Sequence, residues 1–207
     1  MNVLVIVAHP DDEIIGCGGT MLKHLDKNDN VSIFVLSKGW NDYQNNDMYD
    51  LYNNKPEIKL YTSNFEDNKF DSHPLLDIIE EIEKCIFKVK PDIIYTHSSN
   101  DLNIDHRIVY QAVLTANRPC NKLYAEEIYS CEIASSTEWQ FPNKFNPNVW
   151  IEIDIKGKIN LMKYYGSQLK DYPHPRSLLG LENRSKYWGN IVLKRYCEVF
   201  ELIRMVK

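Results

Sequence analysis

A continuous apolar run of mostly β-branched residues opens the chain, from Val3 to Val7, and constrains the fold more than any other feature. Such a run is typical of a strand that is covered on both faces. Apolar residues then recur at helical spacing from Ile14 to about Lys27, and a second apolar run extends from Val31 to Leu36. Strand, helix and strand within 36 residues predict a right-handed βαβ unit and hence a parallel sheet.

The rest of the chain continues this alternation of helices and strands. An amphipathic helix is expected from Leu75 to Ile86, and a short buried strand from Asp92 to Tyr95. The remaining expected elements are a helix over about 105–116, strands near 126–133 and 149–153, and a helical C-terminal quarter broken at Pro173 and Pro175. We interpret the polar stretch 38–54 as a loop with room for a short helix. Residues 1–207 therefore predict a single α/β domain, with a mostly parallel sheet and helices on both faces.

Charge and composition narrow the classes of function. A net charge of −5 argues against nucleic acid as a partner, although local Arg or Lys residues could still hold a small anion. No apolar stretch approaches the ~18–20 residues of a membrane span. The five cysteines are odd in number and form no Cys-x-x-Cys pair, as expected of reduced thiols. With no signal peptide before the first strand, we expect a cytoplasmic protein.

A polar cluster, Ala8-His9-Pro10-Asp11-Asp12-Glu13, follows the first predicted strand directly. Ligands bind open parallel sheets at the carboxyl ends of the strands, so a site is expected here. His9 and Asp12 can face one point, and imidazole with carboxylate suits a divalent metal, above all zinc. Asp11 would then point elsewhere and be free to act on a metal-bound water.

A second polar cluster follows the strand 92–95 and leads into the next helix. If the strands are parallel, its residues lie at the same edge of the sheet as His9. His106 is the natural third metal ligand, and Asp105 or Asp101 could orient its free ring nitrogen or another ligand. Three protein ligands and a water are the pattern of a catalytic zinc site.

Each cluster also has a simpler interpretation. Asp-Asp-Glu after a strand is often only a helix cap with favourable charges, and a single His106 is more often a structural or surface residue. The two clusters at matching positions favour a metal site. Gly16-Cys17-Gly18-Gly19 does not predict a dinucleotide loop, because the glycines fall inside the first helix. They would instead let that helix pack closely on the sheet.

The segments Val3–Thr20 and Asp101–Arg118 resemble the LmbE-like (PIG-L) family of zinc-dependent N-deacetylases. The family motif Ala-His-Pro-Asp-Asp-Glu is matched at all six positions from Ala8 to Glu13, and the downstream Asp-His pair corresponds to Asp105-His106. Weaker likeness covers nearly the whole chain, including the segments 67–71, 91–93, 174–177 and 198–202. The resemblance implies a Rossmann-like domain, a zinc ion held by His9, Asp12 and His106, and Asp11 as general base.

The chain departs from better-known members of that family at two points. Many of them carry a histidine three residues before the last zinc ligand, where this chain has Asn103. Many also carry a substrate-contacting Arg after the second strand, whereas no Arg precedes Arg107 here. The general acid is therefore open between His174, His97 and Asp11 acting twice.

The resemblance implies removal of an acetyl group from an N-acetylated sugar or sugar conjugate of the N-acetylglucosamine type, free or nucleotide- or thiol-linked. Zinc would activate the water, Asp11 would take its proton, and Asn103 or His97 could donate to the oxyanion. The expected substrate contacts are Lys38, Trp40, His97 and Arg176. The alternative function is a non-catalytic metal- or carbohydrate-binding protein. A homo-oligomer is compatible with the sequence.

Overall fold

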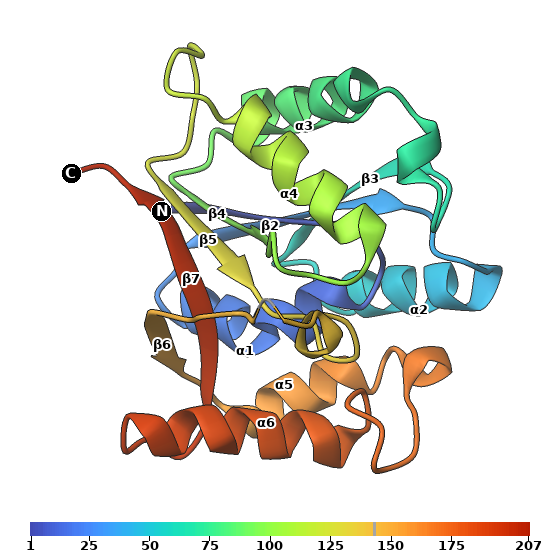
Figure 1. Cartoon of the computed structure of the whole chain (residues 1–207), viewed down its shortest axis with the longest axis vertical. Helices are drawn as coiled ribbons and strands as arrows, with labels where there is room; N and C mark the ends of the chain where they lie inside the picture. Colours follow the sequence, from blue (N-terminus) through green and yellow to red (C-terminus); the bar gives the residue numbers. More distant parts are fainter. Residues whose placement is uncertain (143) are drawn as a thin grey trace.

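The computed structural model describes residues 1–142 and 144–207. Its centre is a seven-stranded sheet in the order β3-β2-β1-β4-β5-β7-β6 (Figure 1). Strands β3, β2, β1, β4 and β5 pair in parallel, and β7 pairs antiparallel with both β5 and β6. The strands are β1 (Asn2–Val7), β2 (Asn30–Ser37), β3 (Lys59–Phe65), β4 (Ile93–His97), β5 (Glu127–Cys131), β6 (Val149–Glu152) and β7 (Cys197–Met205). The predicted single α/β domain with a mostly parallel sheet is confirmed.

Helices cover both faces of the sheet, as the apolar runs predict (Figure 1). Along β1, Val3, Val5 and Val7 pack into one core and Leu4 and Ile6 into the other. The first core is closed by α1 (Asp12–Asp26), α2 (Asp42–Asn53), α5 (Ile155–Met162) and α6 (Leu178–Ile191), and the second by α3 (Leu75–Val89) and α4 (Ile104–Ala116). Three 3₁₀ turns, η1 (Phe70–Ser72), η2 (Thr137–Trp139) and η3 (Gly166–Gln168), complete the elements.

Three elements differ from the sequence-based expectation. The stretch interpreted mainly as loop contains the twelve-residue helix α2, which buries Met48 and Leu51. Strand β3 was not predicted, because as an edge strand it alternates half-buried with exposed residues and carries no apolar run. The C-terminal quarter is not helical throughout: its last element is β7, which is inserted between β5 and β6.

The glycines after the first polar cluster do allow close packing, as expected. Helix α1 kinks at Cys17, whose φ of −146° is not helical. A Cβ atom at Gly16 would lie 2.6 Å from Cys131 Sγ, and one at Gly19 would lie 2.7 Å from the side chain of Ile153. Helix α1 thus approaches the sheet more closely than any larger side chain would permit.

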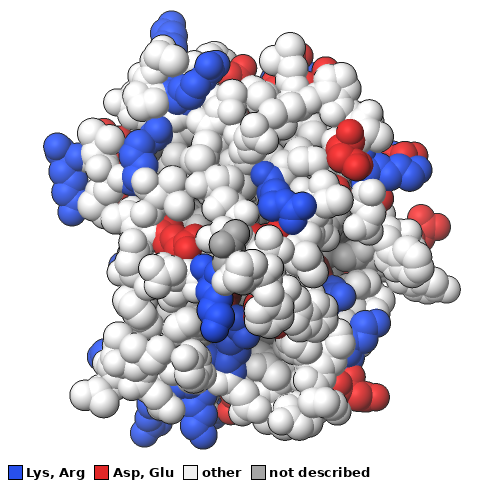
Figure 2. Space-filling model, in the orientation of Figure 1, with Lys and Arg blue, Asp and Glu red and all other residues white. Residues whose placement is uncertain are grey.

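The topology places a crevice between β1 and β4. From β1 the chain builds β2 and β3 on one side and then returns to β4 on the other side of β1. The carboxyl ends of β1 and β4 meet at this change of direction, the usual ligand site of an open α/β sheet. Among the described residues, no helix has the length and apolar character needed to cross a membrane. On the face drawn in Figure 2, basic side chains are interspersed with acidic and uncharged ones.

Candidate metal centre

The turn from β1 into α1 carries the first two candidate ligands, His9 and Asp12. The backbone N–H of His9 donates to Asp12 Oδ2 over 2.9 Å, which closes the turn and brings both side chains to one side. Between them Asp11 adopts a positive φ of 98°. Because of this backbone reversal, the two adjacent aspartates point in different directions.

The turn from β4 into α4 carries the third candidate, His106. Asn103 is the N-cap of α4, and its side-chain oxygen accepts hydrogen bonds from the backbone N–H groups of Asp105 (2.8 Å) and His106 (3.3 Å). The cap fixes the first turn of α4, from which His106 reaches toward β1.

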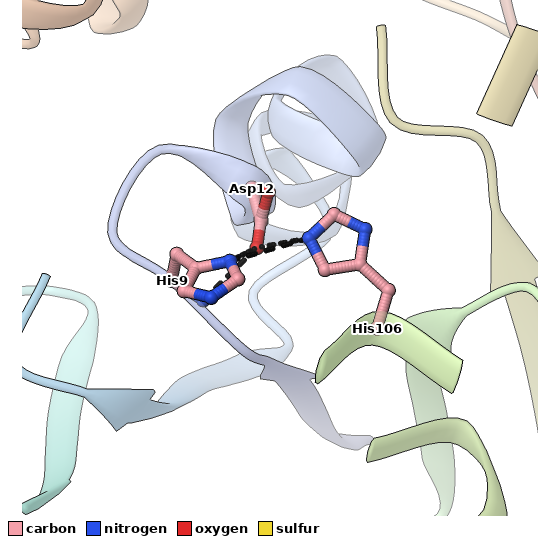
Figure 3. Close-up of side chains that lie close together, drawn as sticks. All are labelled: His9, Asp12 and His106. Atoms are coloured by element: carbon pink, nitrogen blue, oxygen red, sulfur yellow. Dashed lines mark hydrogen bonds and ion pairs between the residues drawn. The ribbon is translucent and has the colours of Figure 1, made fainter. Parts of the chain in front are cut away.

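The three side chains converge on one point (Figure 3). His9 Nδ1 lies 3.2 Å from His106 Nε2, and Asp12 Oδ2 lies 3.3 Å from each of these nitrogens. All three residues are buried. Two imidazole nitrogens and a carboxylate oxygen therefore form a nearly equilateral triangle.

This triangle fits a zinc ion. Zinc in proteins is usually tetrahedral with N and O ligands at about 2.0–2.1 Å, which places neighbouring ligand atoms about 3.3–3.4 Å apart. The observed edges agree with that spacing, and the donor set is one that zinc prefers. The cluster can hold a divalent metal without rearrangement of its side chains.

Two carboxylates support the histidines from behind. Asp105 Oδ2 lies 3.0 Å from His9 Nε2, and Asp101 Oδ2 lies 3.1 Å from His106 Nδ1. Each histidine thus has its outer nitrogen against a carboxylate, the arrangement that orients metal-ligating imidazoles. The sequence left open whether Asp105 or Asp101 orients a metal ligand. In the structure, Asp105 contacts His9 and Asp101 contacts His106.

Both supporting carboxylates also anchor neighbouring loops. Asp105 accepts hydrogen bonds from the backbone N–H groups of Asn68 (2.8 Å) and Phe70 (3.2 Å). Asp101 accepts hydrogen bonds from the hydroxyls of Ser136 and Thr137. The segments after β3 and β5 are therefore fixed to the same centre.

The electrostatics of the cluster favour a cation. Burial lowers the pKa of His9, but its contacts with Asp105 and Asp12 outweigh this effect and raise it to about 10. For His106, burial likewise acts downward, and Asp12 and Asp101 raise its pKa to about 9. Burial acts to raise the pKa of Asp12, but the two histidines hold it well below its usual range. The carboxylates thus stabilise positive charge at the centre of the cluster.

Asp11 has a different environment from Asp12. Burial and the neighbouring charge of Asp12 raise its pKa to about 8, against the opposing charge of Arg176. One guanidinium nitrogen of Arg176, Nη1, lies 3.2 Å from Asp11 Oδ2. Asp11 is thus a carboxyl group whose pKa lies near neutrality at the edge of the metal cluster, as general bases require.

A pocket of about 340 Å³ opens beside the cluster. Its wall includes His9, Asp11, Asp12, Asn103 and His106, which were all expected at the site. Among the predicted substrate contacts, Trp40 and Arg176 line it. The loop after β5 contributes Ser135 and Ser136. A pocket of this size and mixed character suits a small polar ligand.

Three of the predicted residues lie outside the pocket lining. Lys38 is exposed, because the chain turns at Gly39 (φ 77°) and brings Trp40 to the pocket instead. His97 is fully buried: its ring stacks on His106 at 3.9 Å, and its Nε2 accepts a hydrogen bond from the backbone of Ala8. Neither Lys38 nor His97 lines the pocket, and His97 packs against the candidate ligand His106.

His174 is the third of these residues. Its Nδ1 accepts a hydrogen bond from the backbone N–H of Arg176 (3.1 Å), and its ring packs edge-on against Trp139. His174 does not line the pocket, and its catalytic role stays a prediction. The residue shapes the turn that leads into α6, and Arg176 reaches the pocket in its place.

Sequence reasoning assigned no role to several polar pocket residues, among them Asp67, Gln44 and Lys170. Asp67 Oδ2 lies 3.7 Å from His9 Nε2, and Gln44 donates to the carbonyl oxygen of Pro10 over 2.6 Å. Lys170 contributes a second cation beside Arg176. Asp67 follows the unpredicted strand β3, and Gln44 lies in α2, in the stretch interpreted mainly as a loop with room for a short helix. Recognising β3 would have placed Asp67 at the ligand-binding edge.

The chain is similar to one known protein family and to several solved structures. Residues 4–117 match the model of the GlcNAc-PI de-N-acetylase (PIG-L) family. This region contains β1 with its polar cluster and extends past the N-terminal turn of α4. A search by sequence among curated proteins found no match.

Solved structures share the fold at low identity. The conserved protein TT1542 from Thermus thermophilus is 18% identical, with a TM-score of 0.81 over 100% of this chain and 96% of that chain. The N,N'-diacetylchitobiose deacetylase of Pyrococcus horikoshii is 19% identical, with a TM-score of 0.79 over 98% of this chain and 83% of the other. The 4-carboxy-2-hydroxymuconate hydratase GalB of Pseudomonas putida is 16% identical, with a TM-score of 0.71 over 100% and 99% of the two chains. At these identities the likeness concerns the fold.

Proposed function

This chain belongs to the GlcNAc-PI de-N-acetylase (PIG-L) family, and on that premise we propose that it is a zinc-dependent hydrolase that removes the acetyl group from an N-acetylated sugar or sugar conjugate. The observation that supports this proposal most directly is the triangle of His9, Asp12 and His106, whose edges of 3.2–3.3 Å suit a tetrahedral zinc ion. The triangle lies in the wall of a pocket that can admit a substrate.

Each reacting group in amide hydrolysis has a counterpart in the pocket. Zinc bound by the three residues would supply a Lewis acid and lower the pKa of a water to about 7. Asp11 borders the pocket and holds the carboxylate that takes a proton from the attacking water. With His174 outside the pocket, Asp11 also returns that proton to the departing amine. The side-chain amide of Asn103 lines the pocket and offers a neutral donor to the substrate.

The sugar would bind at the pocket mouth. Trp40 lines the pocket and is 73% exposed, so its ring can stack on the apolar face of a sugar. Ser135, on the loop after β5, also lines the pocket and offers a hydroxyl for the sugar hydroxyl groups. The substrate we propose is of the N-acetylglucosamine type, free or joined to a nucleotide or thiol carrier, and the protein acts in the cytoplasm.

The deciding experiment is a substrate panel. Purified, zinc-loaded protein is incubated with free, nucleotide-linked and thiol-linked N-acetylglucosamines, and released acetate is measured. We expect acetate from at least one member, and none from the His106→Ala variant. The alternative function, a non-catalytic binding protein, predicts ligand binding by calorimetry without acetate from any member.

A further inference from the structure

Asn103 stands where many family members carry a histidine, and a residue near the C-terminus could supply the positive charge that Asn103 lacks. A histidine at this position could place a positive charge in the pocket, whereas Asn103 is neutral and its side-chain oxygen already caps α4. His97 cannot fill this position, because its ring is fully buried, stacks on His106 and accepts a hydrogen bond from the backbone N–H of Ala8. Arg176 and Lys170 are the Arg and Lys side chains that line the pocket.

Arg176 is the cation that reaches the reacting groups. Its Nη1 lies 3.2 Å from Asp11 Oδ2, and Asp11 is the only hydrogen-bond partner of its guanidinium among the described residues. Its Nε atom is buried without a hydrogen-bond partner, while the side chain as a whole is 28% exposed. The guanidinium therefore has unused donors beside the base and remains accessible from the pocket.

The backbone that carries Arg176 is held firmly. Its N–H donates to His174 Nδ1, and the next residue, Ser177, is buried and caps α6 through a hydrogen bond from the backbone of Gly180. A Cβ atom at Gly180 would lie 2.6 Å from the carbonyl oxygen of Pro175, so the first turn of α6 packs directly on this segment. A fixed backbone with a partly free guanidinium allows small shifts of the charge over the pocket.

We propose that Arg176 is a catalytic residue that stabilises the negative charge of the tetrahedral intermediate, in the place that Asn103 leaves uncharged. The inference rests on the proposed deacetylase function. In the reactive form, Asp11 is ionised and its negative charge pairs with Arg176. Asp11 then takes a proton from water, the water oxygen bonds to the carbonyl carbon, and the π electron pair moves to the carbonyl oxygen. The negative charge thus moves from Asp11 to that oxygen, and the guanidinium of Arg176 shifts its hydrogen bond from Asp11 to the oxyanion.

Collapse of the intermediate completes the balance. The carbon–nitrogen bond breaks with its electron pair on nitrogen, which receives the proton held by Asp11. The oxyanion pair re-forms the carbonyl bond, so acetic acid and the amine are the first products. The acid then gives its proton to the amine or to solvent and leaves as acetate, and Asp11 is again an anion beside Arg176. A charge-assisted donor is well suited to this role, because hydrogen bonds to charged groups are about twice as strong as neutral ones.

Three variants test the role of Arg176: Arg176→Gln, Arg176→Lys and the control Arg195→Gln, which alters an exposed arginine outside the pocket lining. On the substrate that the wild type deacetylates, Arg176→Gln should lower kcat about 10²–10³-fold, the usual effect of losing an oxyanion donor. KM, zinc content and the melting temperature should stay near wild type. Arg176→Lys should be intermediate, and Arg195→Gln should match wild type. Added guanidinium should partly restore the activity of a further variant, Arg176→Ala.

A binding measurement separates this inference from the proposed function. Methylphosphonate is a tetrahedral anion with a methyl group, and calorimetry should show at least tenfold weaker binding to zinc-loaded Arg176→Gln than to wild type. If no substrate yields acetate, the proposed function fails. The methylphosphonate affinities still test whether Arg176 binds a tetrahedral anion in the pocket. Equal affinity in the two proteins, a rise in KM with unchanged kcat, or loss of zinc in Arg176→Gln would each overturn the assignment.

Discussion

The division of labour between the adjacent aspartates depends on one unusual backbone conformation. Asp11 has a φ of 98°, a region that costs a non-glycine residue about 1–3 kcal/mol. Glu13 holds this turn: its carboxylate accepts from the backbone N–H of Asp11 (3.1 Å) and from the hydroxyls of Tyr52 (2.7 Å) and Tyr165 (2.5 Å). The turn directs Asp12 toward the histidines and Asp11 toward Arg176.

Asp11→Asn and Asp12→Asn should separate the two roles. Asp11→Asn should keep its zinc and lose about 10²–10⁴-fold in turnover, because an amide cannot accept the proton of water. Asp12→Asn should lose zinc as well as activity, because it removes the only carboxylate of the triangle. The checks are metal content and acetate release. Loss of zinc from Asp11→Asn would make Asp11 a ligand and would contradict this division.

The metal stoichiometry tests the triangle directly. Wild type should contain about one zinc per chain, and His106→Ala much less, because a ligand is removed from a buried site. His174→Ala is the matched control: it also removes an imidazole, but one outside the pocket lining, and should keep its zinc. Full metal content in His106→Ala would show that the metal, if bound, lies elsewhere.

At the scale of single elements, two glycines define how helix α1 meets the sheet. A methyl group at Gly16 would overlap Cys131 Sγ, and one at Gly19 would overlap the β-branched side chain of Ile153. Gly166, in contrast, has no atom within 4 Å of a Cβ position. The three glycines therefore form a matched set for a stability experiment.

Gly16→Ala and Gly19→Ala should each destabilise the protein by about 1–3 kcal/mol through overpacking. Gly166→Ala should leave stability within about 0.5 kcal/mol of wild type. Urea unfolding followed by circular dichroism measures the differences. A neutral Gly19→Ala would mean that α1 can move away from Ile153 at no cost.

How far the sequence predicts these elements depends on their burial. Strands β1, β2 and β4 are covered on both faces and appear as unbroken apolar runs, so both the parallel sheet and its ligand-binding edge could be predicted. Strand β3 is half exposed, and β7 turns from buried to exposed along its length. In both strands, which residues are buried depends on the other elements that pack against them, and the strand's own sequence does not reveal these.

The candidate site follows the same rule. His9, Asp12 and His106 could be assigned because each follows directly from a predicted strand end or helix start. Arg176 was predicted only as a substrate contact, and its position beside Asp11 depends on packing between two segments that are 165 positions apart in the sequence. Local sequence patterns contain no information about such contacts.

At the scale of the whole molecule, one buried carboxylate joins three elements. Glu198 of β7 accepts hydrogen bonds from the backbone N–H groups of Gly19 (2.9 Å) and Thr20 (2.7 Å) at the kink of α1. Lys158 of α5 pairs with it at 2.7 Å, and both side chains are buried. This network connects α1, which begins at Asp12, to α5 on the same face and to β7 of the sheet.

Glu198→Gln should destabilise the protein by about 3–5 kcal/mol, because it leaves the ammonium of Lys158 buried without a counter-charge. Glu152→Gln is the control, since the Glu152–Lys194 pair is exposed, and it should change stability by no more than about 0.5 kcal/mol. Denaturant midpoints decide the comparison. Equal effects of the two substitutions would show that the buried pair contributes no more to the free energy of unfolding than the exposed pair does.

The position of β7 has a consequence for synthesis. During translation, the chain emerges from its amino terminus, so β1 to β5 and the helices between them leave the ribosome before β7. Until β7 arrives, β5 keeps an open edge, β6 has no neighbouring strand, and Lys158 has no Glu198. The sheet of the nascent chain therefore stays incomplete until β7 is synthesised. This strand is the last of the described elements to be made, and it joins β5 to β6.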